Sequence, residues 1–299
     1  MSIITVSRED FVKRYDSHET KQVVIKSLKS WDAFLESKNY AEPELFAQMR
    51  ENGNGKYIVL DQWVQFALQT KYVTTVKTYL SYVKAWVKYN DVEISTDRIK
   101  DYVKFPKVVK DRPRGIDRDV VRKILDECDD FYRAFILVLV AAGMRNRSEV
   151  INMRWDWIEW KSDPPMVVIP AEHTKTKQER ITFLTPETIA ALGKIPRDQD
   201  RIFPITYDMF YTYLKKIRVK LGLNAKTSSG VYHFKPHRFR GFTENKLSKS
   251  VGEEFAHAIT GHGNYLGQYF AGGTTDTEAG NDYKKAISEL TIYDTRRTS

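Results

Sequence analysis

The side chains best suited to chemistry gather in one stretch of the sequence, residues 236–270. It offers a histidine, an arginine one helical turn later, a second histidine after a glycine and then a tyrosine: His237, Arg240, His262 and Tyr269. Arginine presents a rigid fork of donors to phosphate oxygens, histidine exchanges a proton near neutral pH, and tyrosine can form a covalent intermediate. Because no cysteine or carboxylate stands at metal-ligand spacing here, the stretch indicates a phosphate clamp with a nucleophile and no metal.

Two cationic side chains upstream extend this set. Arg145 stands in Gly-Met-Arg directly after a strongly apolar run, and Lys175 stands in Thr-Lys-Thr between two β-rich runs. We expect Arg145 at the N-terminus of a helix, where the helix dipole disfavours a cation, so its position suggests an anion to bind. Lysines in turns are common, so Lys175 by itself would indicate nothing.

In order along the chain, these residues resemble the active-site pattern of the tyrosine recombinases, the phage integrase family. That pattern has an arginine, a lysine, His-x-x-Arg, Gly-His and a tyrosine, and the matching residues here are Arg145, Lys175, His237, Arg240, His262 and Tyr269. The resemblance implies a site-specific DNA recombinase or integrase of the kind found in mobile elements, in which the tyrosine attacks a DNA phosphate. It also implies that the 3′-phosphotyrosyl bond keeps the energy of the broken link, so that no ATP, metal or other cofactor is needed.

The arginine and lysine assignments each have an alternative. The family's first arginine lies in Gly-x-Arg-x-x-Glu, and here one extra residue separates Arg145 from Glu149. Some branches of the family read similarly, so we assign Arg145 and keep Arg147 as the alternative. The family keeps its general acid on a hairpin turn, which favours Lys175 over Lys177. A lysine can protonate a leaving 5′-oxygen when neighbouring cations lower its pKa.

The tyrosine also departs from the family's usual spacing. Tyr269 follows the Gly-His pair more closely than the family's tyrosine usually does. Tyr265 comes sooner still, whereas Tyr283 and Tyr293 come late, and Tyr283 belongs to the predicted apolar face of a last helix. We therefore assign Tyr269 as the nucleophile and keep the other three as alternatives.

The composition fits a folded protein with a polyanionic partner. The 299 residues include 48 Lys and Arg and 39 Asp and Glu, a formal net charge of +9. Such a balance favours nucleic acid first and an anionic membrane second. A hydrophobic content of 41% and an aromatic content of 13% are sufficient for a core and exclude a disordered chain. A single cysteine, Cys128, excludes an internal disulfide framework and a cysteine-based zinc site.

No targeting or spanning segment is predicted. The polar N-terminus lacks the apolar core of a signal peptide, and the longest apolar run, residues 135–143, is far shorter than the ~20 residues that span a bilayer. We expect a soluble, intracellular protein that acts on DNA in the cytoplasm.

Apolar residues at helical spacing predict a small all-helical domain in residues 1–105. The predicted helices are 23–35, 60–68 and 76–87. Residues 106–115, which are basic and rich in proline, read as a linker. The resemblance implies that the first domain is a core-type DNA-binding domain and that residues 116–299 form the catalytic domain.

The second domain is predicted to be mainly helical with one β-hairpin. Its predicted helices are 117–127, 131–142, 148–153, 186–192 and 207–221, and its strands are 166–170 and 180–184 around a polar turn. The fold class is therefore α+β, mainly α with a small hairpin or sheet.

Double-stranded DNA is the expected partner, with a homotetramer on DNA and accessory DNA-bending proteins as further expectations from the family. A polar, glycine-bearing stretch, residues 271–282, precedes an apolar stripe at helical spacing: Tyr283, Ala286, Ile287 and Leu290. We expect a monomer that assembles on DNA by docking this last helix on an adjacent protomer. Two other functions fit the same fold: a DNA-binding protein without catalysis, and a type IB topoisomerase-like enzyme.

Overall fold

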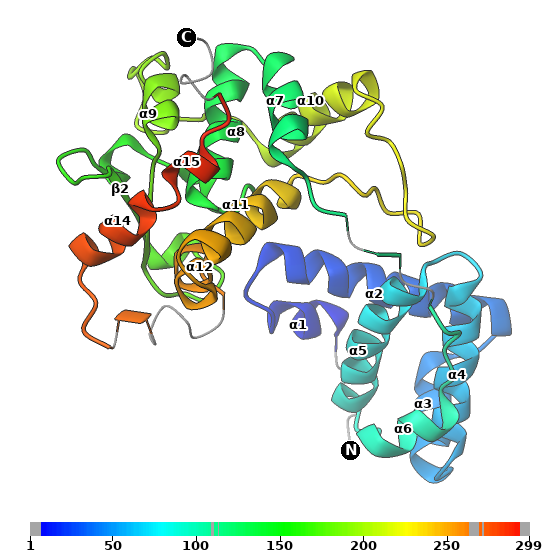
Figure 1. The fold of residues 1–299 in the computed structure, drawn as a ribbon. Coiled ribbons are helices and arrows are strands. Elements are labelled where there is room, and N and C mark those ends of the chain that lie inside the picture. Colours follow the sequence, from blue (N-terminus) through cyan, green and yellow to red (C-terminus); the bar gives the residue numbers. More distant parts are fainter. Residues whose placement is uncertain (1–6, 109–110, 113, 263–268, 271, 294–299) are drawn as a thin grey trace. The chain divides into compact units, whose positions relative to one another are not determined.

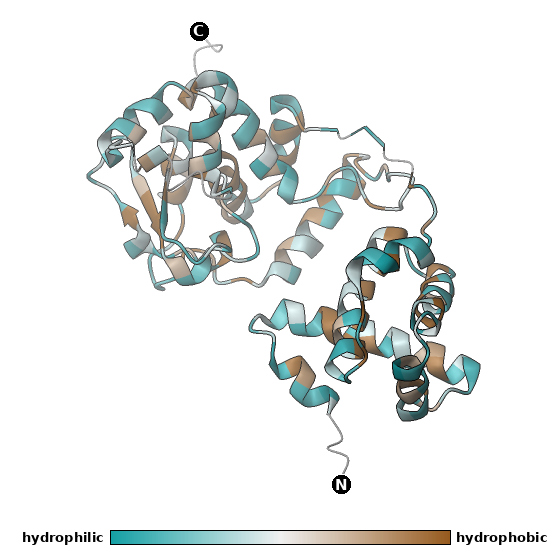
Figure 2. Ribbon diagram, turned by 90° about the horizontal axis from the view of Figure 1, so that it is seen from below, coloured by the Kyte–Doolittle hydropathy of each residue, from teal (hydrophilic) through white to brown (hydrophobic). Residues whose placement is uncertain are grey.

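The computed structural model describes residues 7–108, 111–112, 114–262, 269–270 and 272–293. The chain divides into two compact units, Met1–Lys110 and Asp111–Ser299, each with its own hydrophobic core (Figure 1). The division falls inside the stretch predicted to be a linker. Figure 2 shows hydrophobic and hydrophilic residues alternating along the helices of both units. No described helix is both long enough and apolar enough to cross a membrane.

The described part of the first unit is helical. Its helices are α1 (Arg8–Lys13), α2 (His18–Lys38), α3 (Glu42–Glu51), α4 (Gly55–Leu68), α5 (Val73–Tyr89) and α6 (Thr96–Tyr102). The three predicted helices lie within α2, α4 and α5. The short helices α1, α3 and α6 were not predicted, because each offers too few turns for a clear apolar period.

Three fully buried tryptophans form the centre of the first unit: Trp31, Trp63 and Trp86. The carboxylate of Glu42, at the start of α3, accepts the indole N–H of Trp31 at 2.7 Å and that of Trp86 at 2.9 Å. Buried indole N–H groups need such acceptors, so one acidic residue ties α3 to both α2 and α5.

The second unit is built around a buried helix. Its helices are α7 (Arg118–Asp126), α8 (Asp130–Ala142), α9 (Pro186–Leu192), α10 (Tyr207–Lys220), α11 (His237–Ser250), α12 (Glu253–Thr260), α14 (Asp276–Lys284) and α15 (Ile287–Leu290). Every residue from 134 to 142 is buried, and α8 packs against α9 and α11 (Figure 1). Asp117, Asp129 and Thr185 cap α7, α8 and α9 by accepting backbone N–H groups. These helices agree with the predicted ranges.

A small antiparallel sheet lies between α8 and α9 in the sequence. It contains β1 (Ile158–Glu159), β2 (Met166–Ile169) and β3 (Arg180–Phe183), in the order β1-β2-β3. Val167 pairs with Thr182, so the predicted hairpin is confirmed and gains one short strand. The helix predicted over 148–153 is instead a single 3₁₀ turn, Val150–Asn152. Its apolar residues are all buried, and the Asn152 side chain bonds the Ser148 carbonyl at 2.9 Å, an alternative to a continued helix.

The C-terminal segment differs most from the prediction. Residues 276–282, part of the polar stretch that precedes the apolar stripe, belong to α14, which begins with a capping box between Thr275 and Glu278. The apolar stripe is buried in the core of its own unit: Tyr283, Ala286 and Leu290 are at most 1% exposed. The Tyr283 hydroxyl donates to the Ala141 carbonyl at 2.9 Å. The prediction that this stripe docks on another protomer is therefore wrong.

Candidate active site

A buried carboxylate holds two arginines in the second unit. Glu149, fully buried, accepts the backbone N–H of Arg145 at 2.6 Å, the Arg145 Nη1 at 2.7 Å and the Arg180 Nη2 at 2.5 Å. Burial alone would raise the pKa of the Glu149 carboxyl, but the charges of Arg180 and Arg145 and the backbone bond outweigh it and hold the pKa below its usual range. Glu149 therefore stays ionised and fixes the Arg145 guanidinium.

A third arginine lies close to this pair. Arg240, on α11, is 2% exposed; its Nη1 donates to the Gly143 carbonyl at 2.5 Å and its Nη2 to the Thr260 carbonyl. Burial, and then the charges of Arg180 and Arg145, lower the pKa of Arg240 to about 9, which leaves it charged at neutral pH. We call Arg145, Glu149, Arg180 and Arg240 the guanidinium cluster.

Two glycines bring helix ends to the guanidinium cluster. Gly143 ends α8 at φ +58° and Gly261 ends α12 at φ +68°, a backbone conformation that favours glycine. The Gly143 carbonyl accepts from Arg240, and the Gly261 carbonyl accepts the Arg145 Nη2 at 2.8 Å. A Cβ at Gly261 would lie 2.9 Å from the Arg180 Cδ, so only a glycine fits there.

No chemical role was predicted for Arg180, and Glu149 entered the prediction only as part of the family motif. Arg180 begins β3, is 2% exposed, and donates its Nη1 to the Ile259 carbonyl in α12 as well as to Glu149. The sequence signal for a buried ion pair was an arginine at the start of an apolar strand, because a charge that is buried there requires a partner. Its partner could not be read from spacing because the two lie on separate elements.

Both candidate histidines lie beside Arg240. The pKa of His237, the first residue of α11, is lowered by burial and then by the charge of Arg240, although Glu244 opposes the shift. The pKa of His262 is lowered in the same way, by burial and then by Arg240. The His262 Nδ1 lies 3.3 Å from the Glu244 carboxylate. The structure thus brings Arg145, His237, Arg240 and His262 together.

The two candidate arginines near residue 145 differ in their surroundings. The charge of Arg145 acts on Arg240 and on both histidines. The Arg147 guanidinium instead lies 4.4 Å from the ring centroid of Tyr207. These contacts favour Arg145 as the phosphate ligand.

The candidate lysines lie on the turn between β2 and β3. Lys175 is exposed, and Lys177, at φ +55°, donates its Nζ to the Glu172 carbonyl at 3.1 Å. Among the residues that the structure describes, no hydrogen bond or ion pair joins either lysine to the guanidinium cluster. The hairpin is present as predicted, and the role of Lys175 as the general acid remains a prediction.

The Tyr269 hydroxyl is held by an acidic residue. It donates to the Asp282 Oδ2 at 2.7 Å, and its ring packs edge-on against Phe255, with ring centroids 5.4 Å apart. Burial and then the hydrogen bond to Asp282 raise the pKa of Tyr269. The described contacts do not join this hydroxyl to the guanidinium cluster.

The alternative tyrosines have other partners. Tyr283 is fully buried and bonded to Ala141, as described above, and the Tyr293 hydroxyl donates to Asp126. Tyr265 lies outside the described residues. Among the candidate tyrosines that the structure describes, Tyr269 is half-buried and lies nearest in sequence to the Gly-His turn.

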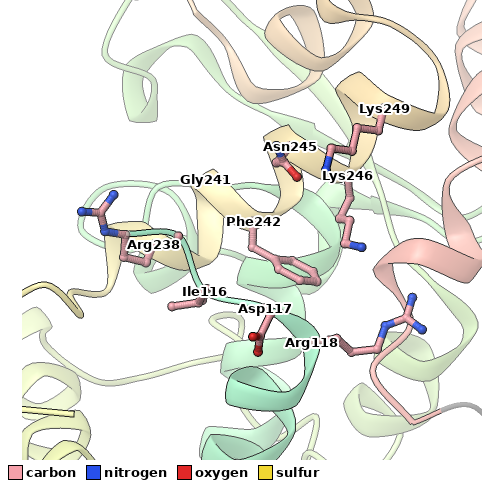
Figure 3. Close-up of a pocket in the computed structure, with 10 residues that line it drawn as sticks. Ile116, Asp117, Arg118, Arg238, Gly241, Phe242, Asn245, Lys246 and Lys249 are labelled. Carbon is pink, nitrogen blue, oxygen red and sulfur yellow. The ribbon is translucent and has the colours of Figure 1, made fainter. Parts of the chain in front are cut away.

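A basic pocket lies on another face of α11, next to the first residues of α7 (Figure 3). Arg238, Lys246 and Lys249 line it, whereas His237 and Arg240 do not. The Lys246 ammonium donates to Glu289 at 2.5 Å. The pocket therefore adds positive charge on α11, but it does not include the candidate catalytic residues of that helix.

Comparison with known proteins places this geometry in a family. The profile described as "Phage integrase family" matches residues 114–266, more than half of the chain. Tyrosine recombinase XerA of Saccharolobus solfataricus is 25% identical over 190 residues, which are 60% of this chain and 60% of that protein. The chain thus spans about 60% of the length of this relative.

Solved structures share the fold at low identity. A lambda integrase tetramer bound to a Holliday junction has a TM-score of 0.60 at 14% identity, covering 85% of this chain and 74% of the integrase. The Tn1549 transposon integrase in complex with transposon right-end DNA has a TM-score of 0.60 at 12% identity, covering 93% and 96%. The mainly helical fold with its small sheet is therefore that of these integrases. With the profile match over the second unit, the chain belongs to the phage integrase family, the tyrosine recombinases.

Proposed function

We propose that this protein is a site-specific DNA recombinase that cleaves and rejoins DNA strands through a 3′-phosphotyrosyl intermediate. The observation that carries the proposal is the pair Arg145 and Arg240, both fixed by buried partners beside two histidines. Each guanidinium has five N–H donors, and its described contacts leave others for a phosphate. Arginines fixed in advance stabilise charge that develops on the non-bridging oxygens without reorganising during the reaction.

In the proposed reaction, the Tyr269 oxygen bonds to phosphorus while the bond from phosphorus to the 5′-oxygen breaks. The tyrosine proton passes to a histidine, His237 or His262, whose lowered pKa favours the neutral form that can accept it. Lys175 supplies the proton to the leaving 5′-oxygen. A 5′-hydroxyl then attacks the phosphotyrosyl bond and regenerates the tyrosine. The energy of the link is conserved throughout, so no ATP is required.

Two movements are needed for this reaction. The Tyr269 hydroxyl must leave Asp282, and the turn that carries Lys175 must approach the phosphate. We propose that DNA drives both, because a phosphate between the arginines attracts the lysine and offers the tyrosine its target. The basic pocket on α11 and three lysines of α5, Lys77, Lys84 and Lys88, would contact backbone phosphates.

We also propose the partners and the domain roles. Residues 1–105 would bind duplex DNA, and residues 116–299 would cleave it. A homotetramer would assemble on two duplexes, by analogy with the lambda integrase tetramer on a Holliday junction. Because the C-terminal stripe is buried in its own unit, this assembly must use other surfaces.

Covalent capture tests the proposal and selects the DNA site in the same experiment. The protein is incubated with a library of nicked duplexes of randomised sequence, and adducts that survive detergent are recovered and sequenced. We expect an enriched DNA sequence and, by mass spectrometry, DNA linked to the peptide that contains Tyr269. Sequence-selective DNA binding without any adduct would instead favour the non-catalytic alternative. Adducts without strand exchange between duplexes would favour the topoisomerase-like alternative.

A further inference from the structure

The fold brings together three side chains that the sequence keeps apart. The Glu244 Oε1 on α11 lies 3.2 Å from the His257 Nε2 on α12 and 3.3 Å from the His262 Nδ1. The nitrogen and oxygen atoms of these three residues that could bind a metal ion lie within 4.8 Å of one another. None of the three side chains is fully buried, so an ion from solution can reach them.

The distances fit a specific kind of ion. Zinc binds imidazole nitrogen and carboxylate oxygen at about 2.0–2.1 Å in a tetrahedral arrangement, which places neighbouring ligand atoms about 3.3 Å apart. The distances from the Glu244 Oε1 to the two histidine nitrogens, 3.2 and 3.3 Å, match this ligand-to-ligand spacing. The distance between the two histidine nitrogens, which lie within 4.8 Å of each other, reaches it if the rings move slightly closer. Two histidines and a glutamate leave the fourth position open for water or a phosphate oxygen.

Backbone geometry fixes two of the ligands relative to each other. At the end of α12, the Gly261 N–H bonds the Ala258 carbonyl at 3.1 Å and the His262 N–H bonds the His257 carbonyl at 2.9 Å. This pair of bonds is a Schellman motif, which folds the chain back over the last turn of the helix. It brings His262 onto His257, with ring centroids 5.4 Å apart, and Glu244 faces both from the neighbouring helix.

We propose that Glu244, His257 and His262 bind a zinc ion, or a divalent transition metal of similar preference, and that this ion inhibits the protein by occupying His262. The inhibition rests on the proposed function, whereas the metal site does not. The nearby charges of Arg240 and Arg145 oppose a dication, so binding weaker than in a structural zinc site is consistent with reversible inhibition. Mg²⁺, which prefers six oxygen ligands, should not compete.

Metal binding is measured first, without DNA. The full chain is titrated against Zn²⁺ in competition with a chromophoric chelator, and we expect one ion per chain. Changing ligand-orienting groups alone costs 10–100-fold in affinity, so Glu244→Gln and His257→Gln should each lower zinc affinity by at least about 10-fold. His18→Gln, an exposed histidine in the first unit, is the matched control and should bind like the unmodified protein.

Two further readouts separate loss of a ligand from loss of folding. Zinc should raise the thermal midpoint of the unmodified protein and of His18→Gln, but much less that of Glu244→Gln, because a ligand stabilises only the state that binds it. Co²⁺ in place of zinc should give the visible absorption of a tetrahedral site in the unmodified protein and not in Glu244→Gln. Absence of binding, or unchanged zinc affinity in both ligand variants, would overturn the proposal.

Inhibition is measured as the ratio of covalent adduct formed with and without zinc, so that changes in the basal rate cancel. We expect zinc, but not Mg²⁺, to lower this ratio for the unmodified protein and His18→Gln, and His257→Gln to resist it. If no adduct forms under any condition, the proposed function fails while the binding measurements still decide the metal site. If zinc binds and adduct formation is unaffected, the inhibitory role is wrong.

Discussion

The guanidinium cluster and the region of Tyr269 and Asp282 differ in how firmly their side chains are held. In the cluster, three arginines are fixed by one buried carboxylate and by carbonyls from the ends of α8 and α12. In the second region, the hydroxyl of the half-buried Tyr269 is held by one partly exposed carboxylate, that of Asp282. The groups proposed to bind the phosphate are therefore built in permanently, whereas the proposed nucleophile is held by a contact that can be exchanged.

The largest effect is expected for Tyr269→Phe, which should abolish covalent adduct formation while DNA affinity stays within about two-fold, since the ring packing is retained. Adducts are measured by denaturing gel and binding by mobility shift. Tyr293→Phe is the matched control and should still form adducts. Adduct formation by Tyr269→Phe would move the nucleophile to another tyrosine.

Arg145→Ala and Arg240→Ala should each lower the cleavage rate by about 10²–10³-fold, the usual cost of removing one donor to a developing charge. DNA affinity should change little, because it comes from many backbone contacts. Arg147→Ala is the control and should cleave normally. A parallel loss of DNA affinity would contradict a role specific to the reacting phosphate, and the opposite result for Arg147 would transfer the role to it.

Glu149→Gln tests the rigidity of the cluster. Removing one partner of a buried ion pair costs about 3–5 kcal/mol, so the free energy of unfolding at neutral pH should fall by that amount in denaturant titrations. The pKa of Glu149 is lowered in the folded state, so its contribution is fully present above the unfolded pKa of about 4.3 and is lost as the pH falls from there through the lower folded pKa. The glutamine variant should therefore lose less stability on acidification than the unmodified protein. An equal loss would show that Glu149 is not the titrating group.

The smallest effect is expected for Asp282→Asn. A hydrogen bond to a charged acceptor is stronger than one to a neutral amide by about 1 kcal/mol, so releasing Tyr269 should raise the single-turnover cleavage rate roughly 5-fold. The pKa of Tyr269 should fall, because the carboxylate that raises it is gone. Asp276→Asn, also on α14, is the control. Slower cleavage by Asp282→Asn would mean that the carboxylate assists the tyrosine instead of restraining it.

Local patterns in the sequence predicted those parts of the fold that depend on local forces. The long helices α2 and α5 have clear apolar periods, α8 follows from a strongly apolar run, and the β2–β3 hairpin follows from two β-rich runs. The short helices and β1 were missed because their stability comes from packing against distant elements. The apolar stripe of the last helix was recognised, but its partner was not, since periodicity shows that a face is buried and not what covers it.

The candidate site divides in the same way. Motif order predicted Arg145, His237, Arg240 and His262, which the structure brings together, and their catalytic roles remain predictions. The contacts of Arg180 with Glu149 and Ile259, and of Glu244 with both histidines, join separate elements and leave no trace in spacing. The position of Tyr269 against Asp282 depends on one tertiary hydrogen bond and was equally inaccessible to the sequence.

Gly261 bears on how the proposed activity would be lost over generations. A single methyl group there would meet Arg180, shift the carbonyl that holds Arg145, and turn His262 away, because all three depend on the same backbone conformation. Decay of the site would then occur in one step instead of residue by residue. A descendant could retain every arginine, histidine and tyrosine of the motif and be inert, so an intact motif is no guarantee of an active copy unless the glycine accompanies it.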